Sequence, residues 1–315
     1  MQSLTHLSLN FEPQHITQDS KGTLFLLDEA SGNILRVGSS SAKDDSSTEI
    51  VANTRGAPHS CTFDSNDQLF ICDLAHQGIL SLAQTELPQQ SSNDSQDVAQ
   101  EPTVEEFVRE YESKLFRGPN SIVIDKSSDR ETQDVFFTDS GLIGEGMESA
   151  SGGSGSPSAS GSLYWIRNGD LLQPIDLENL KTPYGVCLSS QTGCLYVAEL
   201  QENRLIRYVR SRGKGGWIRS TWMQFSGRMG PSALAYSNGY IFVAHYDMRE
   251  SRTRHGRVVV VDERDCAIVD EIIIENGCEV SGLCVSRDAQ TLYITERVTK
   301  SVYKVDIGVL PQQDE

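Results

Sequence analysis

Six segments of the chain share one pattern of apolar and polar residues. Each begins with a short turn and continues as a strand in which apolar and polar residues alternate. A polar turn follows, and then a second strand that ends near Asp, Glu or His. The segments begin at Pro13, Pro58, Pro119, Pro183, Pro231 and Val280, with starts 45, 61, 64, 48 and 49 residues apart. Alternation with period two predicts half-buried β-strands.

Most segments are followed by a third strand-like stretch, such as GNILRVG, GSLYWIR or GRVVVVD. Short strands and turn residues that repeat at such intervals are typical of β-propeller blades. We therefore predict an all-β chain that forms a single six-bladed β-propeller over residues 1–315, with four-stranded antiparallel blades. The early stretch LTHLSLNF is expected to complete the last blade, which would remove an exposed sheet edge.

Two polar stretches interrupt the pattern, at residues 86–104 and 144–161. Both are low in complexity and rich in Ser, Gly, Gln and acidic residues, so they cannot contribute a packed core. We interpret them as loop insertions between strands of the propeller.

The residue that follows each turn Pro or Val is expected to point into the mouth of the central channel. These six mouth residues are Gln14, His59, Asn120, Tyr184, Ser232 and Ser281. Because all inner strands of a propeller converge on one axis, the mouth residues form the predicted ligand site. His59 and Tyr184 are candidates for a general base and an oxyanion donor, or they are ring residues that hydrogen-bond neighbouring turns.

A second set of polar residues ends the second strand of each segment. It consists of Asp28, Asp73, Asp139, Glu199, His245 and Glu296. These side chains could face the same mouth as ligands, but capping of the turns by polar side chains is the favoured interpretation. Glu199 and Glu296 are also candidates for a carboxylate that acts as acid or base.

The chain resembles the senescence-marker-protein (regucalcin) and gluconolactonase family. The stretch from EFVREYESKLFRGPNSIVID to VFFTDSG resembles the part of that family that carries a Pro-Asn-Asp turn, and LKTPYGVCLSSQTGCLYVAEL resembles its Pro-Asn-Gly strand pair. NHL-repeat and strictosidine-synthase-like propellers share the second pattern. The resemblance implies a six-bladed propeller with one axial divalent cation, usually calcium, which polarises a lactone carbonyl or a phosphoryl oxygen.

The resemblance also implies four metal ligands, of which one survives here. Asn120 matches a family Asn, whereas Gln14 stands in the place of the Glu, Tyr184 of the second Asn and Ser232 of the Asp. Ser121 replaces the Asp that follows the family's first Asn. Calcium sites are tuned by the number of charged oxygen ligands, and these positions provide no charge. We predict no tight axial calcium and no other cofactor.

The composition narrows the classes of partner and location. The chain has 27 Lys and Arg against 44 Asp and Glu, a net charge of −17, which disfavours a general nucleic-acid binder. No apolar run is long enough to span a membrane, and the start lacks the features of a secretory signal. The seven cysteines form no Cys-x-x-Cys motif, and several lie in apolar strands. Buried, reduced thiols in a cytoplasmic protein are the favoured interpretation.

The charge is unevenly distributed along the chain. Residues 204–257 contain ten Arg, one Lys and two acids, a balance of 11 − 2 = +9, so the remainder carries −26. Arg252 and Arg254 belong to a loop expected on the face of the mouth. This basic segment predicts a site for a small anionic ligand or an acidic protein surface, or else a solvated basic loop.

Three functional hypotheses follow from these features. The first is a binding or interaction module for an anionic ligand or an acidic protein partner, supported by the missing carboxylates and the basic segment. The alternative is a calcium-dependent lactonase or esterase, a hydrolase of the gluconolactonase type, supported by the resemblance and Asn120. A third is metal-independent chemistry of the strictosidine-synthase kind, with Glu199 or Glu296 as the acid or base.

Overall fold

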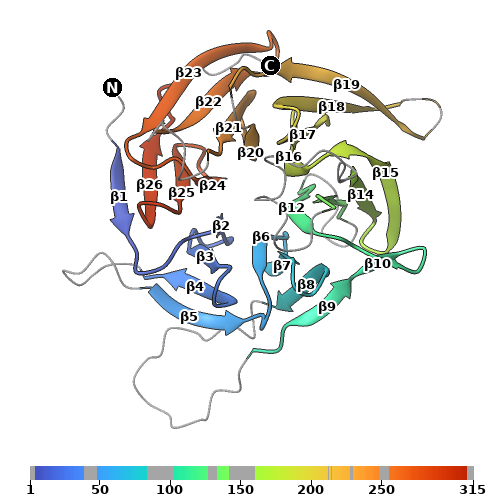
Figure 1. The fold of residues 1–315 in the computed structure, drawn as a ribbon, viewed down its shortest axis with the longest axis horizontal. Helices are drawn as coiled ribbons and strands as arrows, with labels where there is room; N and C mark the ends of the chain where they lie inside the picture. Colours follow the sequence, from blue (N-terminus) through green and yellow to red (C-terminus); the bar gives the residue numbers. More distant parts are fainter. Residues whose placement is uncertain are drawn as a thin grey trace, which may run out of the picture.

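The computed structural model describes residues 4–38, 48–83, 102–126, 133–141, 160–211, 213, 215–227, 230–247 and 255–310. Most of the two predicted insertions, 86–101 and 144–159, lies outside the described residues. The described residues form only strands, turns and irregular segments, and the strands build six four-stranded antiparallel sheets around one axis (Figure 1). The predicted all-β six-bladed propeller is confirmed.

The first three blades come from the N-terminal half of the chain. Blade 1 contains β2 (His15–Gln18), β3 (Leu24–Asp28), β4 (Asn33–Val37) and β5 (Thr48–Asn53). Blade 2 contains β6 (Pro58–Phe63), β7 (Gln68–Asp73), β8 (Gly78–Ala83) and β9 (Glu105–Val108). Blade 3 contains β12 (Pro119–Ile124), β13 (Val135–Asp139), β14 (Ser160–Arg167) and β15 (Leu171–Lys181). A small hairpin of β10 (Glu110–Tyr111) and β11 (Lys114–Leu115) precedes blade 3.

The other three blades complete the ring. Blade 4 contains β16 (Pro183–Leu188), β17 (Leu195–Glu199), β18 (Arg204–Arg210) and β19 (Trp217–Gln224). Blade 5 contains β20 (Pro231–Ser237), β21 (Tyr240–His245), β22 (Gly256–Asp262) and β23 (Ala267–Ile274). Blade 6 contains β24 (Val280–Val285), β25 (Thr291–Glu296), β26 (Ser301–Asp306) and the N-terminal strand β1 (Thr5–Ser8).

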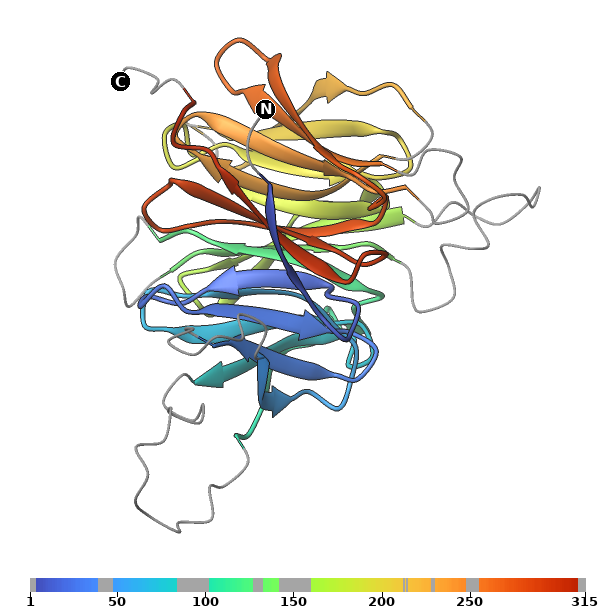
Figure 2. The same ribbon diagram turned by 90° about the vertical axis from the view of Figure 1, so that its left-hand side faces the viewer.

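The two ends of the chain close the ring in blade 6. Strand β1 pairs antiparallel with β26, so that Thr5 faces Lys304 and Ser8 faces Ser301, as predicted for the early strand-like stretch. Figure 2 shows β1 lying along the outer edge of the blade formed by the C-terminal strands. Because the outer strand of the last blade comes from the start of the chain, blade 6 forms only when both ends meet.

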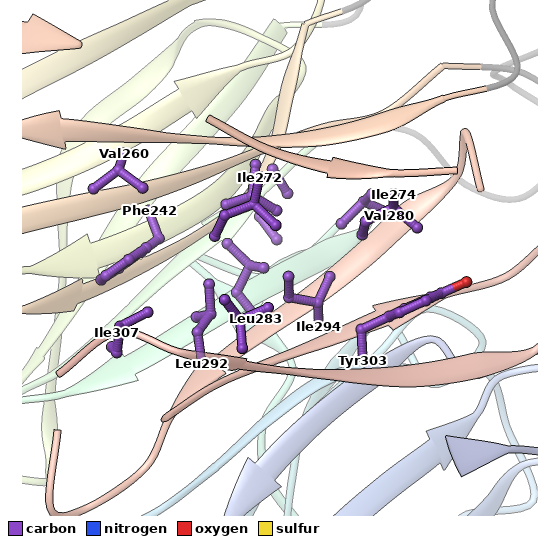
Figure 3. Packing of buried hydrophobic residues seen from close by; sticks show 14 of the residues in the cluster. Phe242, Val260, Ile272, Ile274, Val280, Leu283, Leu292, Ile294, Tyr303 and Ile307 are labelled. Carbon is purple, nitrogen blue, oxygen red and sulfur yellow. The ribbon is translucent and has the colours of Figure 1, made fainter. Parts of the chain in front are cut away.

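The hydrophobic core is divided among the junctions between adjacent blades. Each of the six clusters of buried residues in the described part of the chain draws its side chains from two neighbouring blades. Figure 3 shows the junction of blades 5 and 6, where Phe242 and Val260 of blade 5 pack near Leu283 and Ile294 of blade 6. The apolar face of every strand is therefore buried by the next blade, which explains the period-two pattern of the sequence.

The cysteines pack as apolar residues do. All seven are free, and Cys61, Cys72, Cys187, Cys194 and Cys278 are buried. No helix among the described residues is long and apolar enough to cross a membrane.

A buried carboxylate joins blades 4 and 5. Glu263, in the turn after β22, is 8% exposed and accepts hydrogen bonds from the hydroxyls of Ser189 at 2.9 Å, Thr192 at 2.6 Å and Tyr196 at 2.9 Å. These three donors belong to the hairpin of β16 and β17. No described Lys, Arg or His pairs with Glu263, and the carboxylate can be buried because the hydroxyls replace its hydration.

Replacing this carboxylate should loosen the junction. We expect Glu263→Gln to lower the free energy of unfolding by about 1.5–3 kcal/mol, since hydrogen bonds to a charged acceptor are lost. Glu271→Gln, at an exposed acid of β23 that pairs with Arg257, is the matched control and should change it by less than about 1 kcal/mol. Chemical denaturation measures both; equal stabilities of the two variants would contradict the role given to Glu263.

Candidate functional site

The mouth of the channel is built from one local structure repeated around the ring. In blades 2 to 6 the first residue of the inner strand pairs with the last residue of the second strand, and the register shifts immediately afterwards. The five pairs are Pro58–Asp73, Pro119–Asp139, Pro183–Glu199, Pro231–His245 and Val280–Glu296. The predicted mouth residue follows the pair directly and so lies at a β-bulge, an irregularity that re-aims a side chain.

The acids at the ends of the second strands hold this bulge in place. Asp73 accepts from the backbone N–H of Ala57 at 3.0 Å, and Asp139 accepts from that of Arg117 at 3.1 Å. Glu199 binds the N–H of Lys181 at 2.7 Å. Each donor lies one or two residues before the Pro that starts the inner strand. These carboxylates therefore tie the incoming turn of a blade to its second strand.

Both carboxylate oxygens of Glu199 and of Glu296 accept hydrogen bonds from neighbouring groups. Glu296 is fully buried and accepts from the backbone N–H groups of Glu279, Val298 and Thr299 and from the Thr299 hydroxyl. Glu199 is fully buried as well and is hydrogen-bonded to Arg204 besides Lys181. The described contacts of both carboxylates are those of turn caps, which favours that interpretation over an acid or base.

Four of the six predicted mouth residues come together. The Gln14 amide Nε2 lies 3.1 Å from the His59 Nε2, and the rings of His59 and Tyr184 meet edge to face with centroids 5.2 Å apart. The side chain of Asn120 is hydrogen-bonded to Tyr184. Because His59 and Tyr184 come from blades 2 and 4, their contact narrows the channel in front of blade 3.

The other two mouth residues join blades to each other. Ser232 donates from its hydroxyl to the Val280 carbonyl at 3.1 Å, and Ser281 donates to the Pro13 carbonyl at 2.8 Å. Both serines are buried. The Ser232 hydroxyl thus hydrogen-bonds blade 5 to blade 6, and the Ser281 hydroxyl hydrogen-bonds blade 6 to the turn before blade 1. Both serines therefore help to close the ring.

A further layer of the mouth escaped the sequence analysis. Glu29 Oε2 lies 3.2 Å from His59 Nδ1, and Arg297 Nη2 lies 3.4 Å from Glu12 Oε2. Glu29 and Arg297 each follow directly after the last residue of a second strand. The position after the strand-ending acid was therefore the pattern that could have revealed them. The mouth has a carboxylate after all, although none at the family's ligand positions.

The charges of this layer act on each other and on Tyr184. Burial alone would raise the pKa of Glu29, but the hydrogen bond with His59 and the charges of His59 and Arg297 hold it below its ordinary value. Burial, and then the nearby charge of Glu29, raise the pKa of Tyr184, although its hydrogen bond with Asn120 acts in the opposite direction. Tyr184 is therefore neutral at physiological pH.

Two buried polar atoms of the mouth have no hydrogen-bond partner among the described residues. One is the acceptor Gln14 Oε1, on a side chain that is 3% exposed, and the other is the donor Arg297 Nε. If the Gln14 amide were turned so that its oxygen met His59, its nitrogen would be the atom without a partner. Since buried polar groups are nearly always satisfied, an orphan acceptor and an orphan donor in one mouth point to a water or a ligand.

Asn120, the residue that matches a metal ligand of the family, already has a side-chain partner. Asn120 is 4% exposed, and its side chain is engaged with Tyr184, the residue that stands at the family's second Asn position. Within the part of the chain that the structure describes, no three His, Cys, Asp or Glu side chains are grouped so that they could hold a metal ion.

The basic segment is partly neutralised by acids of the same chain. Arg204 pairs with Glu199, Arg219 lies 3.5 Å from Asp176, and Arg257 lies 3.3 Å from Glu271. Arg252 and Arg254, predicted to bind the anionic partner, lie outside the described residues. The positive balance of residues 204–257 is therefore smaller at the surface than the sequence alone suggested.

Comparison with known proteins gives structural likeness only. No family model matches the chain, and no curated protein matches its sequence. A gluconolactonase from Xanthomonas campestris superposes with a TM-score of 0.70 at 17% identity, covering 97% of this chain and 89% of that chain. A luciferin-regenerating enzyme gives 0.69 at 12% identity, covering 98% and 96%.

A third structure of this kind is the calcium-binding protein regucalcin from Agrobacterium tumefaciens, with a TM-score of 0.65 at 14% identity, covering 96% of this chain and 90% of that chain. The three comparisons agree with the predicted resemblance to gluconolactonase and regucalcin propellers. At such identities they establish a shared fold, whereas chemistry depends on the residues of the site.

A buried histidine near the mouth makes stability depend on pH. His245 is 6% exposed, packs edge to face against Phe225 and has no partner at Nε2; burial, and then the charge of Arg257, lower its pKa from 6.5 to about 3. Between pH 6.5 and about 3, the imidazole of His245 therefore binds a proton in the unfolded chain but stays neutral in the folded protein. The free energy of unfolding must fall as the pH drops through that window.

We expect His245→Gln to flatten this acid dependence between pH 6.5 and about 3, by up to about 1.4 kcal/mol per pH unit. Chemical denaturation at a series of pH values measures the slope. His6→Gln, at an exposed position of β1, is the control and should keep the wild-type slope. A His245→Gln variant as acid-sensitive as the wild type would rule out this histidine as the cause.

Proposed function

We propose that the chain is a binding propeller that takes a small anionic ligand directly at the axial mouth, without a metal ion. The observation that carries this proposal is the orphan pair in the mouth, Gln14 Oε1 and Arg297 Nε. A ligand that accepts from Arg297 and donates to Gln14 would satisfy both groups. The side chain of Arg297 is 29% exposed as a whole, whereas its Nε is buried, so a ligand would reach Nε from within the mouth.

The neighbours of Arg297 restrict the ligand further. Glu12 pairs with Arg297, and the charges of Glu29 and Glu279 act on the same guanidinium. An anion without hydrogen-bond donors would approach the carboxylates of Glu12, Glu29 and Glu279 together with the single cation of Arg297. The ligand that fits therefore joins a carboxylate or phosphate to hydroxyl or amino groups that donate to Glu29 and Gln14.

Independence from a metal is supported by the contacts of the mouth residues. Asn120 already has Tyr184 as its partner, and Tyr184 meets His59 edge to face. A calcium ion takes about six to eight oxygen ligands, which charged carboxylates and carbonyl groups supply together. The described mouth offers neutral amide and phenol groups at the family's ligand positions, so dehydration of the ion would be poorly offset.

A calcium-dependent lactonase or esterase is the second candidate. It is favoured by the likeness to a gluconolactonase and to a calcium-binding regucalcin and by Asn120. The residues of this mouth give it less support than the binding function, for the reasons above. An acidic protein partner for the basic segment is a further proposal, which does not depend on the mouth.

Calcium should leave the thermal stability unchanged. A site with a Kd of about 10 µM would stabilise the folded protein by about 2.7 kcal/mol in about 1 mM calcium, which shifts the melting temperature by several degrees. We expect the same melting temperature with calcium, with chelator and with neither. A calcium-dependent rise that Asn120→Ala abolishes would contradict the proposal and favour the lactonase.

The ligand class is tested with a panel of small molecules. Hydroxy acids, amino acids, simple carboxylates and neutral sugars are added to the protein, and binding is measured by thermal shift and calorimetry. We expect hydroxy or amino acids to bind best and Arg297→Gln to weaken them at least about tenfold, since a charge-assisted hydrogen bond is lost. Arg109→Gln, at an exposed ion pair beside β9, is the matched control. Binding that Arg297→Gln leaves intact would place the ligand elsewhere.

A further inference from the structure

Two arginines lie over one tryptophan on the face of the propeller opposite the mouth. Arg167 ends β14 and Arg210 ends β18, strands that run away from the mouth. The guanidinium carbon of Arg210 lies 4.8 Å from the centre of the Trp165 ring, and that of Arg167 lies 5.6 Å from it. Blades 3 and 4 thus bring together two cations that are distant in the sequence.

The tryptophan that carries them is fixed by its surroundings. Trp165 is 4% exposed, stacks on Phe136 with ring centres 6.1 Å apart, and meets Trp217 at right angles. Trp217 faces Arg210 across the β18–β19 hairpin. The aromatic base is therefore part of the core of this junction, whereas both guanidinium groups remain exposed at its edge.

Neither arginine has an acidic partner among the described residues. In contrast, Arg36, Arg109, Arg204, Arg219, Arg257 and Arg297 all form ion pairs with acids of this chain. Asp134 and Asp170 lie in neighbouring turns, where Asp134 accepts from the backbone N–H of Asn168. Arg117, Arg207 and Arg287 also form no ion pair with a described acid, so Arg167 and Arg210 are distinguished by sharing one aromatic ring.

Stacking prepares these cations for an anionic partner. A guanidinium held against an aromatic ring keeps its N–H groups in its own plane, where they remain free to bind carboxylates in pairs. The ring also fixes part of the long side chain in advance, so less conformational entropy is lost on binding. The ring thus holds two guanidinium groups near it, which would otherwise be mobile charges.

We propose that Arg167 and Arg210, held on Trp165, form a docking surface for an acidic segment of a partner protein. Charge complementarity selects this occupant, because the forks bind carboxylates and nothing in the described chain supplies them. A duplex nucleic acid carries a dense line of phosphates that several clustered Lys or Arg must neutralise, whereas this surface presents two arginines. This surface is independent of the axial ligand and gives the acidic partner a place away from Arg252 and Arg254.

The test uses the full chain and a short fluorescein-labelled peptide rich in Asp and Glu. Fluorescence anisotropy at low and physiological salt measures its affinity. We expect the wild type to bind this peptide and to ignore a Gln/Asn-rich peptide of equal length. Charge reversal in Arg167→Glu with Arg210→Glu should weaken binding at least about tenfold, since both charge-assisted forks are lost.

Two further variants make the result decisive. Arg109→Glu reverses an exposed, paired arginine on blade 2 and should leave the affinity unchanged. Arg252→Glu with Arg254→Glu tests the location that the sequence suggested. The proposal is overturned if that pair abolishes binding while the Arg167 and Arg210 pair does not, if no peptide binds, or if duplex DNA binds more tightly than the acidic peptide. Circular dichroism confirms that each variant is folded, and binding of the axial ligand is scored separately.

Discussion

The structure depends on hydrogen bonds between the carboxylates that end the second strands of blades 2, 3, 4 and 6 and the turns that enter the same blades. Asp73, Asp139, Glu199 and Glu296 each accept from a backbone N–H just before the inner strand. In blades 2 to 6 the backbone N–H of the residue after the second strand also donates to the carbonyl of the residue before the inner strand. Blade 5 has this bond alone, because its second strand ends in His245. The tie fixes the bulge, and the bulge decides which side chain enters the mouth.

The same constraint explains why the mouth has two layers. In blades 2 to 6 the bulge sends one residue of the inner strand toward the axis, and in blade 6 the tied turn positions Arg297, the residue after the acid. In blade 1, Glu29 follows Asp28, which accepts from Ala30 and Ser31 of its own turn. The carboxylates of Asp73, Asp139, Glu199 and Glu296 accept hydrogen bonds from the turns. A propeller can therefore keep its architecture while its mouth chemistry changes, and likeness to gluconolactonase and regucalcin structures describes the frame that carries the site.

Charge is handled differently on the two faces. Around the mouth, Arg297 is surrounded by Glu12, Glu29 and Glu279, so a ligand there meets a mixed field. On the opposite face, Arg167 and Arg210 are supported by an aromatic ring and keep their donors free. Both arrangements combine residues from different blades. The acids around the mouth neutralise Arg297, whereas the opposite face presents Arg167 and Arg210 together.

The sequence by itself determined the fold, because alternating strands and recurring turns encode the period of a sheet and the number of blades. It also predicted the meeting of Gln14, His59, Asn120 and Tyr184, since their place after the turn residue is a local property. It could not show that Ser232 and Ser281 stitch blades together, that Glu29 reaches His59, or that Arg167 and Arg210 share Trp165. These contacts join different blades, and only ring closure sets the distances between residues that far apart in the chain.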